Sequence, residues 1–305
     1  MIANSLKLFL TKLIDYAGLF PPAKLQLKLA LNNYNNDIKC LDKWMLSQFI
    51  LPLSNLNNIT EKMMDGFSQN FPLKLSLLSN DLDLDIDQLF LFKDKFGEKV
   101  EFSGLESKIL DIHSFHTILE KTNEVQNKNQ LNMASFFELP TQENWIDKMI
   151  KSIEIITEFN FNHNSNFGFK LRCGGVEPYM FPSPENIAET IIICIQNNIS
   201  LKFTAGLHHP VRHYNDSIQT KMFGFFNIFI GGMLAKKYRF NHVELIEVLI
   251  DQSSNNFKFK EEGLSWKKYN LSNKEIIQFR ENDFISYGSC SFNEPREDLT
   301  KLGIF

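Results

Sequence analysis

The sequence is poor in features that mark secreted, zinc-binding or membrane proteins. Its four cysteines, at positions 40, 173, 194 and 290, are widely spaced and match no zinc-binding pattern. At this density reduced thiols are expected rather than a disulfide framework. The first 13 residues include Lys7 and Lys12, unlike the uninterrupted apolar core of a signal peptide. No apolar run reaches the roughly 20 residues that a membrane span needs. We therefore expect a cytoplasmic protein with no membrane partner.

The chain also lacks the marks of nucleic-acid and nucleotide binding. Its net charge is −4, and no run of five or more Lys or Arg occurs. There is no Gly-x-Gly-x-x-Gly after the first predicted strand and no Walker motif, so no cofactor is expected. Arginine is scarce, with five against 27 lysines, so an arginine hints that a forked guanidinium is needed.

What the chain does have is an alternation of short β-rich runs and longer amphipathic stretches, which is typical of parallel βα units. The eight predicted strands are Leu13–Leu19, Gln48–Pro52, Leu73–Leu77, Lys99–Ser103, Ala134–Leu139, Gly168–Cys173, Leu201–Ala205 and Phe284–Ser289. The predicted helices are Ala23–Tyr34, Asn57–Gly66, Ile86–Phe96, Ser114–Glu124, Trp145–Phe159, Pro184–Asn197 and Glu294–Leu302. The pattern predicts an α/β fold, a (β/α)8 TIM barrel formed by residues 1–305 as one domain. An open, doubly wound sheet is the alternative.

A long insertion, residues 210–283, separates the seventh and eighth predicted strands. It contains helical patterns near 220–237 and 242–252 and a predicted hairpin that pairs Phe257–Lys260 with Leu264–Lys268. The apolar run Met222–Ala235 is expected to be a buried helix. The chain has 29 phenylalanines, which we expect to lie mostly in the core. Exposed ones are candidates for contacts between copies in a homo-oligomer.

Barrel enzymes work at the C-terminal ends of their strands, so the late strands hold the candidate site. When the glycines that end strands six to eight are aligned, large apolar residues occupy one face. The opposite face, expected to point into the barrel, contains Lys170, Arg172, Lys202, Thr204 and Ser286. Glu138, at the end of strand five, would stand beside them. In the alternative, the lysines point outward and extend between the helices.

Two lysines on adjacent strands, about 4.8 Å apart, predict an unusual amine. Like charge and loss of water both disfavour the ammonium form, so one amine is expected to be neutral near pH 7. A neutral amine can attack a carbonyl group and form a Schiff base. The second lysine would stay charged and hold down the pKa of the first.

Further candidates lie at the ends of the same strands. His208 and His209 are candidates for acid–base catalysis, with loop packing or one metal shared with Glu138 as alternatives. Arg172 and Arg212 are expected to bind an anionic group, or else to form ion pairs with Glu138, Glu177 or Glu101. Asp15 is an acid of the site or an organiser of the first turn. The remaining candidate substrate-binding residues are Thr204, Gly174, Gly175, Gly288, Ser289 and Cys290.

Lys170, Lys202 and the turn Gly288-Ser289 resemble the corresponding strands of class I, Schiff-base aldolases of the deoxyribose-phosphate aldolase type. The resemblance implies that Lys170 forms the imine and that Lys202 relays protons. Residues 15–22, 205–210 and 288–292 are also similar to those of a group of uncharacterised bacterial barrel proteins, which supports the fold alone.

The leading expectation is therefore an aldolase-like lyase that acts on a small, anionic carbonyl compound through a lysine Schiff base. One alternative is a metal-dependent isomerase or hydrolase that uses Glu138 with His208 or His209. The other is a barrel that binds a metabolite without catalysis.

Overall fold

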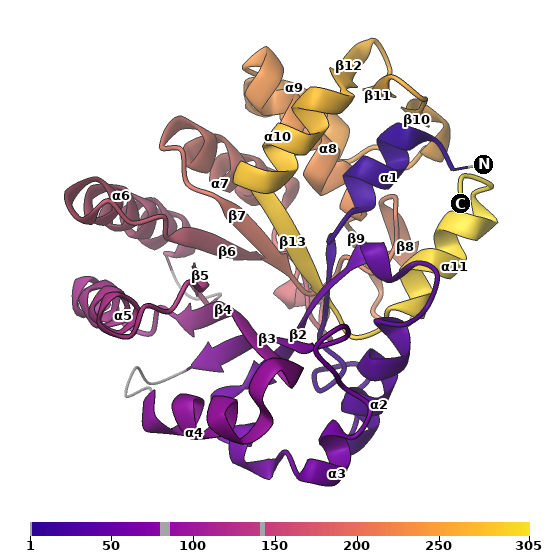
Figure 1. The fold of residues 1–305 in the computed structure, drawn as a ribbon. Coiled ribbons are helices and arrows are strands. Elements are labelled where there is room, and N and C mark those ends of the chain that lie inside the picture. Colours follow the sequence, from indigo (N-terminus) through magenta and orange to yellow (C-terminus); the bar gives the residue numbers. More distant parts are fainter. Residues whose placement is uncertain (1, 80–85, 141–143) are drawn as a thin grey trace.

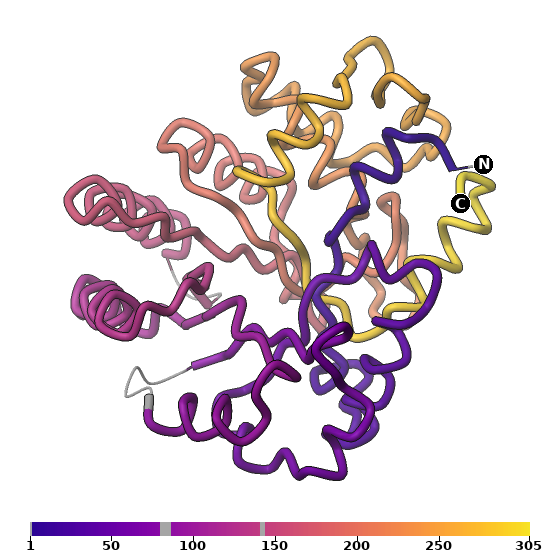
Figure 2. The backbone as a smooth tube through the Cα atoms, viewed as in Figure 1, coloured from indigo at the N-terminus to yellow at the C-terminus, as the bar shows by residue number. Residues whose placement is uncertain are grey.

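Eight parallel strands form the centre of the protein in a computed structural model that describes residues 2–79, 86–140 and 144–305. They are β1 (Ile14–Tyr16), β2 (Leu46–Pro52), β3 (Leu73–Ser79), β4 (Val100–Lys108), β5 (Ala134–Glu138), β6 (Gly168–Arg172), β7 (Leu201–Thr204) and β13 (Phe284–Ser289). The strands close in the order β1-β13-β7-β6-β5-β4-β3-β2. Figure 2 shows the closure, where the yellow C-terminal strand returns beside the indigo N-terminal one. The predicted barrel is confirmed, and the open sheet is wrong.

Helices surround the strands, as Figure 1 shows for α5 to α7 on one side of the barrel. Those that follow barrel strands, some after an intervening segment, are α2 (Leu27–Asp37), α3 (Glu61–Met64), α4 (Ile86–Phe96), α5 (Phe115–Asn129), α6 (Trp145–His163), α7 (Pro184–Gln196), α8 (Phe225–Tyr238) and α11 (Asn293–Lys301). Short 3-10 turns are η1 (Lys43–Met45), η2 (Leu53–Asn58), η3 (Gly97–Lys99), η4 (Pro178–Met180) and η5 (Ser254–Asn256). Helix α7 begins as its sequence predicts, because Ser183 Oγ accepts a hydrogen bond from the Asn186 backbone N–H and Pro184 follows the cap.

The late strands pack their large side chains against α8. Phe203 of β7 meets Phe229 of α8 edge to face, with ring centroids 4.9 Å apart. Tyr287 of β13 stacks on Phe225, with centroids 5.6 Å apart. Residues 225–235 of α8 are all buried, so this predicted helix belongs to the core and supplies no surface for oligomer contacts. Because these large side chains take the outer face of β7 and β13, the residues between them point into the barrel.

The insertion between β7 and β13 is more structured than its sequence predicts. It opens with a hairpin of β8 (His213–Asn215) and β9 (Thr220–Met222), which the sequence analysis missed. After α8 come α9 (His242–Leu249), a three-stranded antiparallel sheet and α10 (Asn273–Asn282). The sheet consists of β10 (Phe257–Phe259), β11 (Gly263–Trp266) and β12 (Tyr269–Ser272). The predicted hairpin corresponds to β10 and β11, and the sequence analysis missed β12.

A buried arginine joins the insertion to the N-terminal helix α1 (Asn4–Leu10). Arg280 of α10 donates hydrogen bonds to the backbone oxygens of Phe9, at 3.0 Å, and Thr11, at 3.2 Å. Burial lowers the pKa of Arg280 to about 9. Both α1 and α10 lead directly into barrel strands, so this contact lies at the N-terminal end of the barrel. The opposite end is left for the site.

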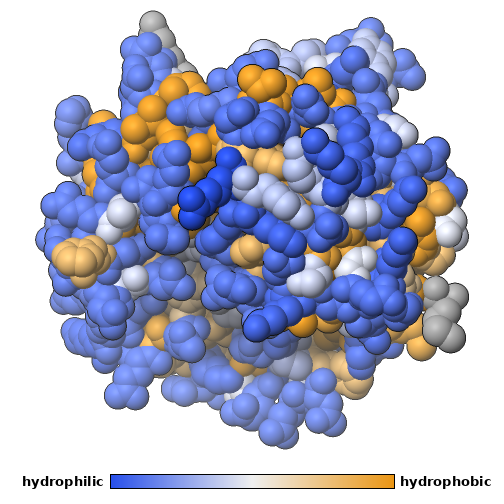
Figure 3. All heavy atoms as spheres, turned by 90° about the horizontal axis from the view of Figure 1, so that it is seen from above, coloured by the Kyte–Doolittle hydropathy of each residue, from blue (hydrophilic) through white to orange (hydrophobic). Residues whose placement is uncertain are grey.

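The outer surface is mainly polar, and apolar side chains interrupt it in separate patches on the face that Figure 3 shows. Within the ranges that the structure describes, none of the helices combines the length and the apolar composition that a membrane crossing requires.

Asn227 joins three segments of the insertion to one another. Its side chain is fully buried in α8, where Oδ1 accepts from the Arg212 backbone N–H at 2.8 Å. Its Nδ2 donates to the backbone oxygens of Val248 and Asp251, each at 2.8 Å. One side chain thereby satisfies three backbone groups, each of which would cost about 1–3 kcal/mol if it were buried without a partner.

We predict that Asn227→Leu lowers the free energy of unfolding by about 2–4 kcal/mol, because it leaves buried backbone groups unpaired. Urea denaturation followed by circular dichroism measures the change. The matched control is Asn282→Leu, at an exposed position on α10, which is expected to change stability by less than about 0.5 kcal/mol. Equal effects of the two substitutions would contradict the structural role of Asn227.

Candidate functional site

Two lysines stand side by side inside the barrel. Lys170 of β6 and Lys202 of β7 are directly paired in the parallel register. Their side chains are 7% and 1% exposed, so they point inward rather than between the outer helices. The structure therefore contradicts the outward alternative that the sequence left open.

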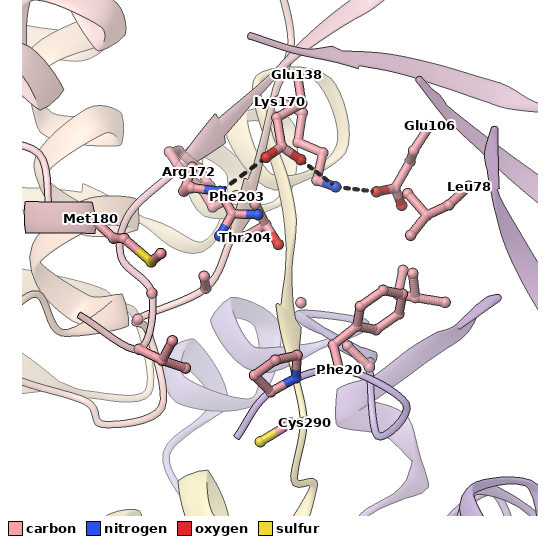
Figure 4. A pocket seen from close by; sticks show the side chains of 18 of the residues that line it. Phe20, Leu78, Glu106, Glu138, Lys170, Arg172, Met180, Phe203, Thr204 and Cys290 are labelled. Atoms are coloured by element: carbon pink, nitrogen blue, oxygen red, sulfur yellow. Dashed lines mark hydrogen bonds and ion pairs between the residues drawn. The ribbon is translucent and has the colours of Figure 1, made fainter. Parts of the chain in front are cut away.

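Carboxylates separate and surround the two amines. Lys170 Nζ lies 2.7 Å from Glu106 Oε2 and 2.9 Å from Glu138 Oε2. Lys202 Nζ lies 2.5 Å from Glu106 Oε1 and 2.9 Å from Asp15 Oδ2. The carboxylate of Glu106 thus bridges both lysines. Figure 4 shows the tip of Lys170 held between Glu138 and Glu106.

Additional donors fix the carboxylates of this cluster. Arg172 Nε donates to Glu138 Oε1 at 3.0 Å. This ion pair is one of the alternatives that the sequence predicted for Arg172. Ser76 Oγ donates to Glu106 Oε1 at 2.6 Å. Ser286 Oγ donates to Asp15 Oδ2 at 2.5 Å. The result is an alternating row of three cations and three carboxylates, in the order Arg172, Glu138, Lys170, Glu106, Lys202 and Asp15.

The balance of charge decides the protonation of the lysines. Burial by itself would lower the pKa of Lys170, but the carboxylates of Glu106 and Glu138 outweigh burial and raise it above its ordinary value. The pKa of Lys202 is raised in the same way by Asp15 and Glu106. The predicted neutral amine is therefore wrong for the resting protein. The two lysines do not face each other unshielded, because Glu106 lies between them.

The pKa values of the carboxylates shift in the opposite direction. Burial would raise the pKa of Glu106, but the two neighbouring ammonium groups hold it well below its usual range. The pKa of Glu138 is also lowered, because Lys170 and Arg172 outweigh the effect of burial. The directions of these shifts favour charged carboxylates at Glu106 and Glu138 beside charged amines at Lys170 and Lys202.

Glu106 is the member of the cluster that the sequence analysis missed. The prediction ended strand four at Ser103, whereas β4 continues to Lys108. The register with β3 shifts between the pairs Leu75–Phe102 and Ser76–Gly104, which leaves Ser103 as an extra residue. Such a bulge changes which side chains face inward. Gly104 permits it, since a Cβ there would lie 2.6 Å from Ser76 Oγ.

A cavity of about 1060 Å³ opens above the cluster at the C-terminal ends of the strands. The predicted site residues that line it are Lys170, Lys202, Glu138, Arg172, Thr204, Gly175, His208, His209, Gly288 and Cys290. Lys108, an exposed residue, also lines the cavity. The structure therefore gathers most of the candidates around one space.

Four predicted residues lie outside the cavity lining of the described chain: Asp15, Gly174, Ser289 and Arg212. Asp15 is fully buried beneath it and acts through Lys202. The guanidinium of Arg212 packs over the ring of Phe223, 4.4 Å from its centroid. Ser289 Oγ donates to the Ser291 backbone oxygen at 2.6 Å and organises the turn after β13. The predicted substrate contacts of these residues are thus not part of the cavity wall.

The two histidines connect the end of β7 to helix α11. His208 Nδ1 lies 2.9 Å from Glu294 Oε2, and His209 Nδ1 pairs with Asp298. His209 also meets the ring of His213 edge to face, with centroids 4.2 Å apart. The close contact with His208 is the main reason why the pKa of Glu294 is lowered. Each histidine therefore has a carboxylate partner at the edge of the cavity, as an acid–base pair requires.

Other chemistry finds less support in the geometry. Burial raises the pKa values of the Cys173 and Cys290 thiols, which disfavours a thiolate nucleophile. Among the described residues, no group of three or more His, Cys, Asp or Glu side chains is arranged to hold a metal ion. Glu138 and the two histidines are paired with separate partners instead.

No protein-family model matches this chain, and no curated protein matches it either. The chemistry of the site is therefore argued from its own geometry.

We predict that Glu106→Gln lowers the free energy of unfolding by about 3–5 kcal/mol, because it removes the anion shared by two buried cations. Glu101→Gln is the matched control on the same strand, where the 46%-exposed Glu101 side chain pairs with Lys74 at 3.0 Å. That exposed pair is expected to contribute about 0–1 kcal/mol. Urea unfolding of both variants measures the difference. Similar losses would show that Glu106 does not neutralise the cluster.

We predict that Glu138→Gln lowers the pKa of Lys170, because the variant loses one of the two anions that stabilise its ammonium form. The midpoint of Lys170 modification by an amine-reactive reagent should move to lower pH by about one unit. Peptide mass spectrometry follows the modification, and the exposed Lys258 serves as the internal reference. A midpoint that stays in place, or that moves to higher pH, would contradict the prediction.

Proposed function

We propose that this protein is an aldolase-like lyase that attacks a small carbonyl compound with the amine of Lys170 and forms a Schiff base. The observation that carries the proposal is the position of Lys170, whose amine lies between two carboxylates and lines the cavity at the active end of the barrel. The paired lysines on β6 and β7 also agree with the resemblance to class I aldolases.

The reaction requires the ammonium group of Lys170 to lose a proton. Glu106 and Glu138 lie within hydrogen-bond distance of Nζ, so a proton can pass directly to either carboxylate. This transfer converts a buried ion pair into two neutral groups, which costs less in a dry interior than loss of the proton to water, because that loss would leave a buried carboxylate without its counter-ion. Lys202 keeps its charge between Asp15 and Glu106.

The neutral amine then adds to the carbonyl carbon of the substrate. The carbinolamine loses its hydroxyl group as water, with a proton supplied by the protonated carboxylate, and becomes an iminium ion. The iminium accepts the electron pair of the carbon–carbon bond that breaks, while a base removes the proton of the substrate's β-hydroxyl group. The products are an aldehyde and an enamine, which water later releases as a carbonyl compound and free Lys170.

His208 and His209 are the proposed bases for the β-hydroxyl group. Both line the cavity, and each contacts a carboxylate of α11 that can stabilise the imidazolium form. Lys202 lies deeper than Lys170, and we assign it to charge balance beside Glu106 rather than to imine formation.

We predict that borohydride, added with a carbonyl compound, attaches the reduced carbonyl to Lys170 and that Lys170→Met abolishes the adduct. Borohydride reduces an imine to a stable amine, so intact-mass and peptide mass spectrometry locate the link. The matched control is Lys108→Met, which removes a lysine from the same cavity and should leave the adduct in place.

A panel that contains aldehydes, ketones and 2-oxo acids makes the test decisive. The proposal fails if the wild-type protein forms no adduct with any member of the panel. It also fails if Lys170→Met retains the adduct at wild-type levels. The first result would favour a barrel that binds a metabolite without covalent chemistry, and the second would place the reactive amine on another lysine of the cavity, such as Lys202 or Lys108.

A further inference from the structure

We propose that the carbonyl substrate carries an uncharged, apolar arm and no phosphate group. This inference deepens the proposed function, because it assumes that Lys170 attacks a carbonyl at the floor of the cavity. It rests on three features of the cavity: an apolar wall, glycine turns that are closed by packing, and a helix end that carries its own carboxylates.

The cavity is polar on one side and apolar on the other. The charged cluster of β4 to β7 lines one side. The opposing wall comes from the loop after β1, from β2 and β3, from the turn after β6, and from the β8–β9 hairpin. Its apolar side chains include Phe20, Ile50, Leu53, Leu78, Met180 and Ile218. Figure 4 shows Phe20 across the open space from the tip of Lys170, and Leu78 next to Glu106.

The glycines in the turns after β6 and β7 lie in close contact with other segments of the protein. A Cβ on Gly206 would lie 2.9 Å from the Gly174 Cα and 2.9 Å from the Cys173 backbone oxygen. A Cβ on Gly174 would lie 2.5 Å from the ring of Phe181. These glycines allow two backbone turns and an aromatic ring to meet. They are therefore explained by packing between protein segments.

The helix that follows β13 begins with acidic side chains at the edge of the cavity. In barrels, phosphate groups are commonly held by the last loops and a helix N-terminus. Here the Glu294 backbone N–H in the first turn of α11 donates to Ser291 Oγ at 3.1 Å. The Glu294 side chain lines the cavity at this point, and Asp298 follows one turn later. Both carboxylates would repel a phosphate group.

The cations of the cluster also have carboxylate partners already. Lys170, Lys202 and Arg172 are balanced by Glu106, Glu138 and Asp15 within the same row of contacts. A dianionic phosphate placed there would have to displace a carboxylate from a buried cation. An apolar arm needs no counter-ion and gains free energy by leaving water for the opposing wall.

The volume of the cavity fits a substrate with such an arm. About 1060 Å³ reaches the upper end of the range for drug-sized ligands, which is roughly 300–1,000 Å³. A two- or three-carbon compound attached to Lys170 would leave most of the apolar wall uncovered. An aliphatic or aromatic arm of several carbons would cover it and exclude water from the imine.

The test compares borohydride trapping rates on Lys170 for probes matched in length but not in charge. The probes are hexanal, 6-oxohexanoate, glycolaldehyde phosphate and acetaldehyde. We expect hexanal to be trapped about tenfold faster than 6-oxohexanoate, and glycolaldehyde phosphate more slowly than acetaldehyde, at equal concentrations. The full-length protein is used throughout.

Leu78→Ser tests the apolar wall directly. It should slow the trapping of hexanal about three- to tenfold more than that of acetaldehyde, because acetaldehyde has no arm to contact residue 78. Ile218→Ser, in the loop between β8 and β9, is the second variant if the first does not fold. The matched control is Leu91→Ser on α4, where the leucine is 68% exposed and no change is expected.

The outcomes separate the two proposals. If no probe reacts with Lys170, the proposed function fails. If Lys170 reacts but glycolaldehyde phosphate or 6-oxohexanoate is trapped as fast as hexanal or faster, the Schiff base stands and the apolar arm is wrong. A loss of acetaldehyde trapping equal to that of hexanal in Leu78→Ser would also overturn the role of the wall.

Discussion

The carboxylate of Glu106 is the contact on which the rest of the site depends. It lies 2.7 Å from one buried ammonium group and 2.5 Å from another. Without an anion at this point, two lysines paired on neighbouring strands would repel each other in a medium that screens charge poorly. The bulge in β4 that turns Glu106 inward is therefore as much a part of the site as the lysines themselves.

A charge-balanced cluster changes how a reactive lysine must be understood. Crowding does not make the amine of Lys170 neutral, because carboxylates from β4 and β5 raise its pKa. In the proposed reaction, the amine becomes nucleophilic by proton transfer within the ion pair when a substrate enters and excludes water. The same balance leaves each of the three cations of the cluster with a carboxylate partner, which directs attention to the apolar wall of the cavity.

The long insertion gives the barrel its particular shape on both ends. Its β8–β9 hairpin supplies part of the cavity wall, and α8 covers β7 and β13 with aromatic side chains. Its last helix, α10, inserts Arg280 beneath the opposite end of the barrel. One segment thus shapes the cavity, supports the strands that carry the site, and closes the floor.

The sequence by itself determined the barrel, the strands of the site, and the inward direction of Lys170 and Lys202. These follow from local patterns: alternating βα units, and large apolar residues on one face of each late strand. Tertiary structure alone decided the protonation of the lysines and the role of Glu106. The sequence placed Glu138 of β5 beside the lysines, but the shift of register in β4 that turns Glu106 inward leaves no local signal. Arg212, near the cavity in sequence, precedes β8 and packs on Phe223, which follows β9.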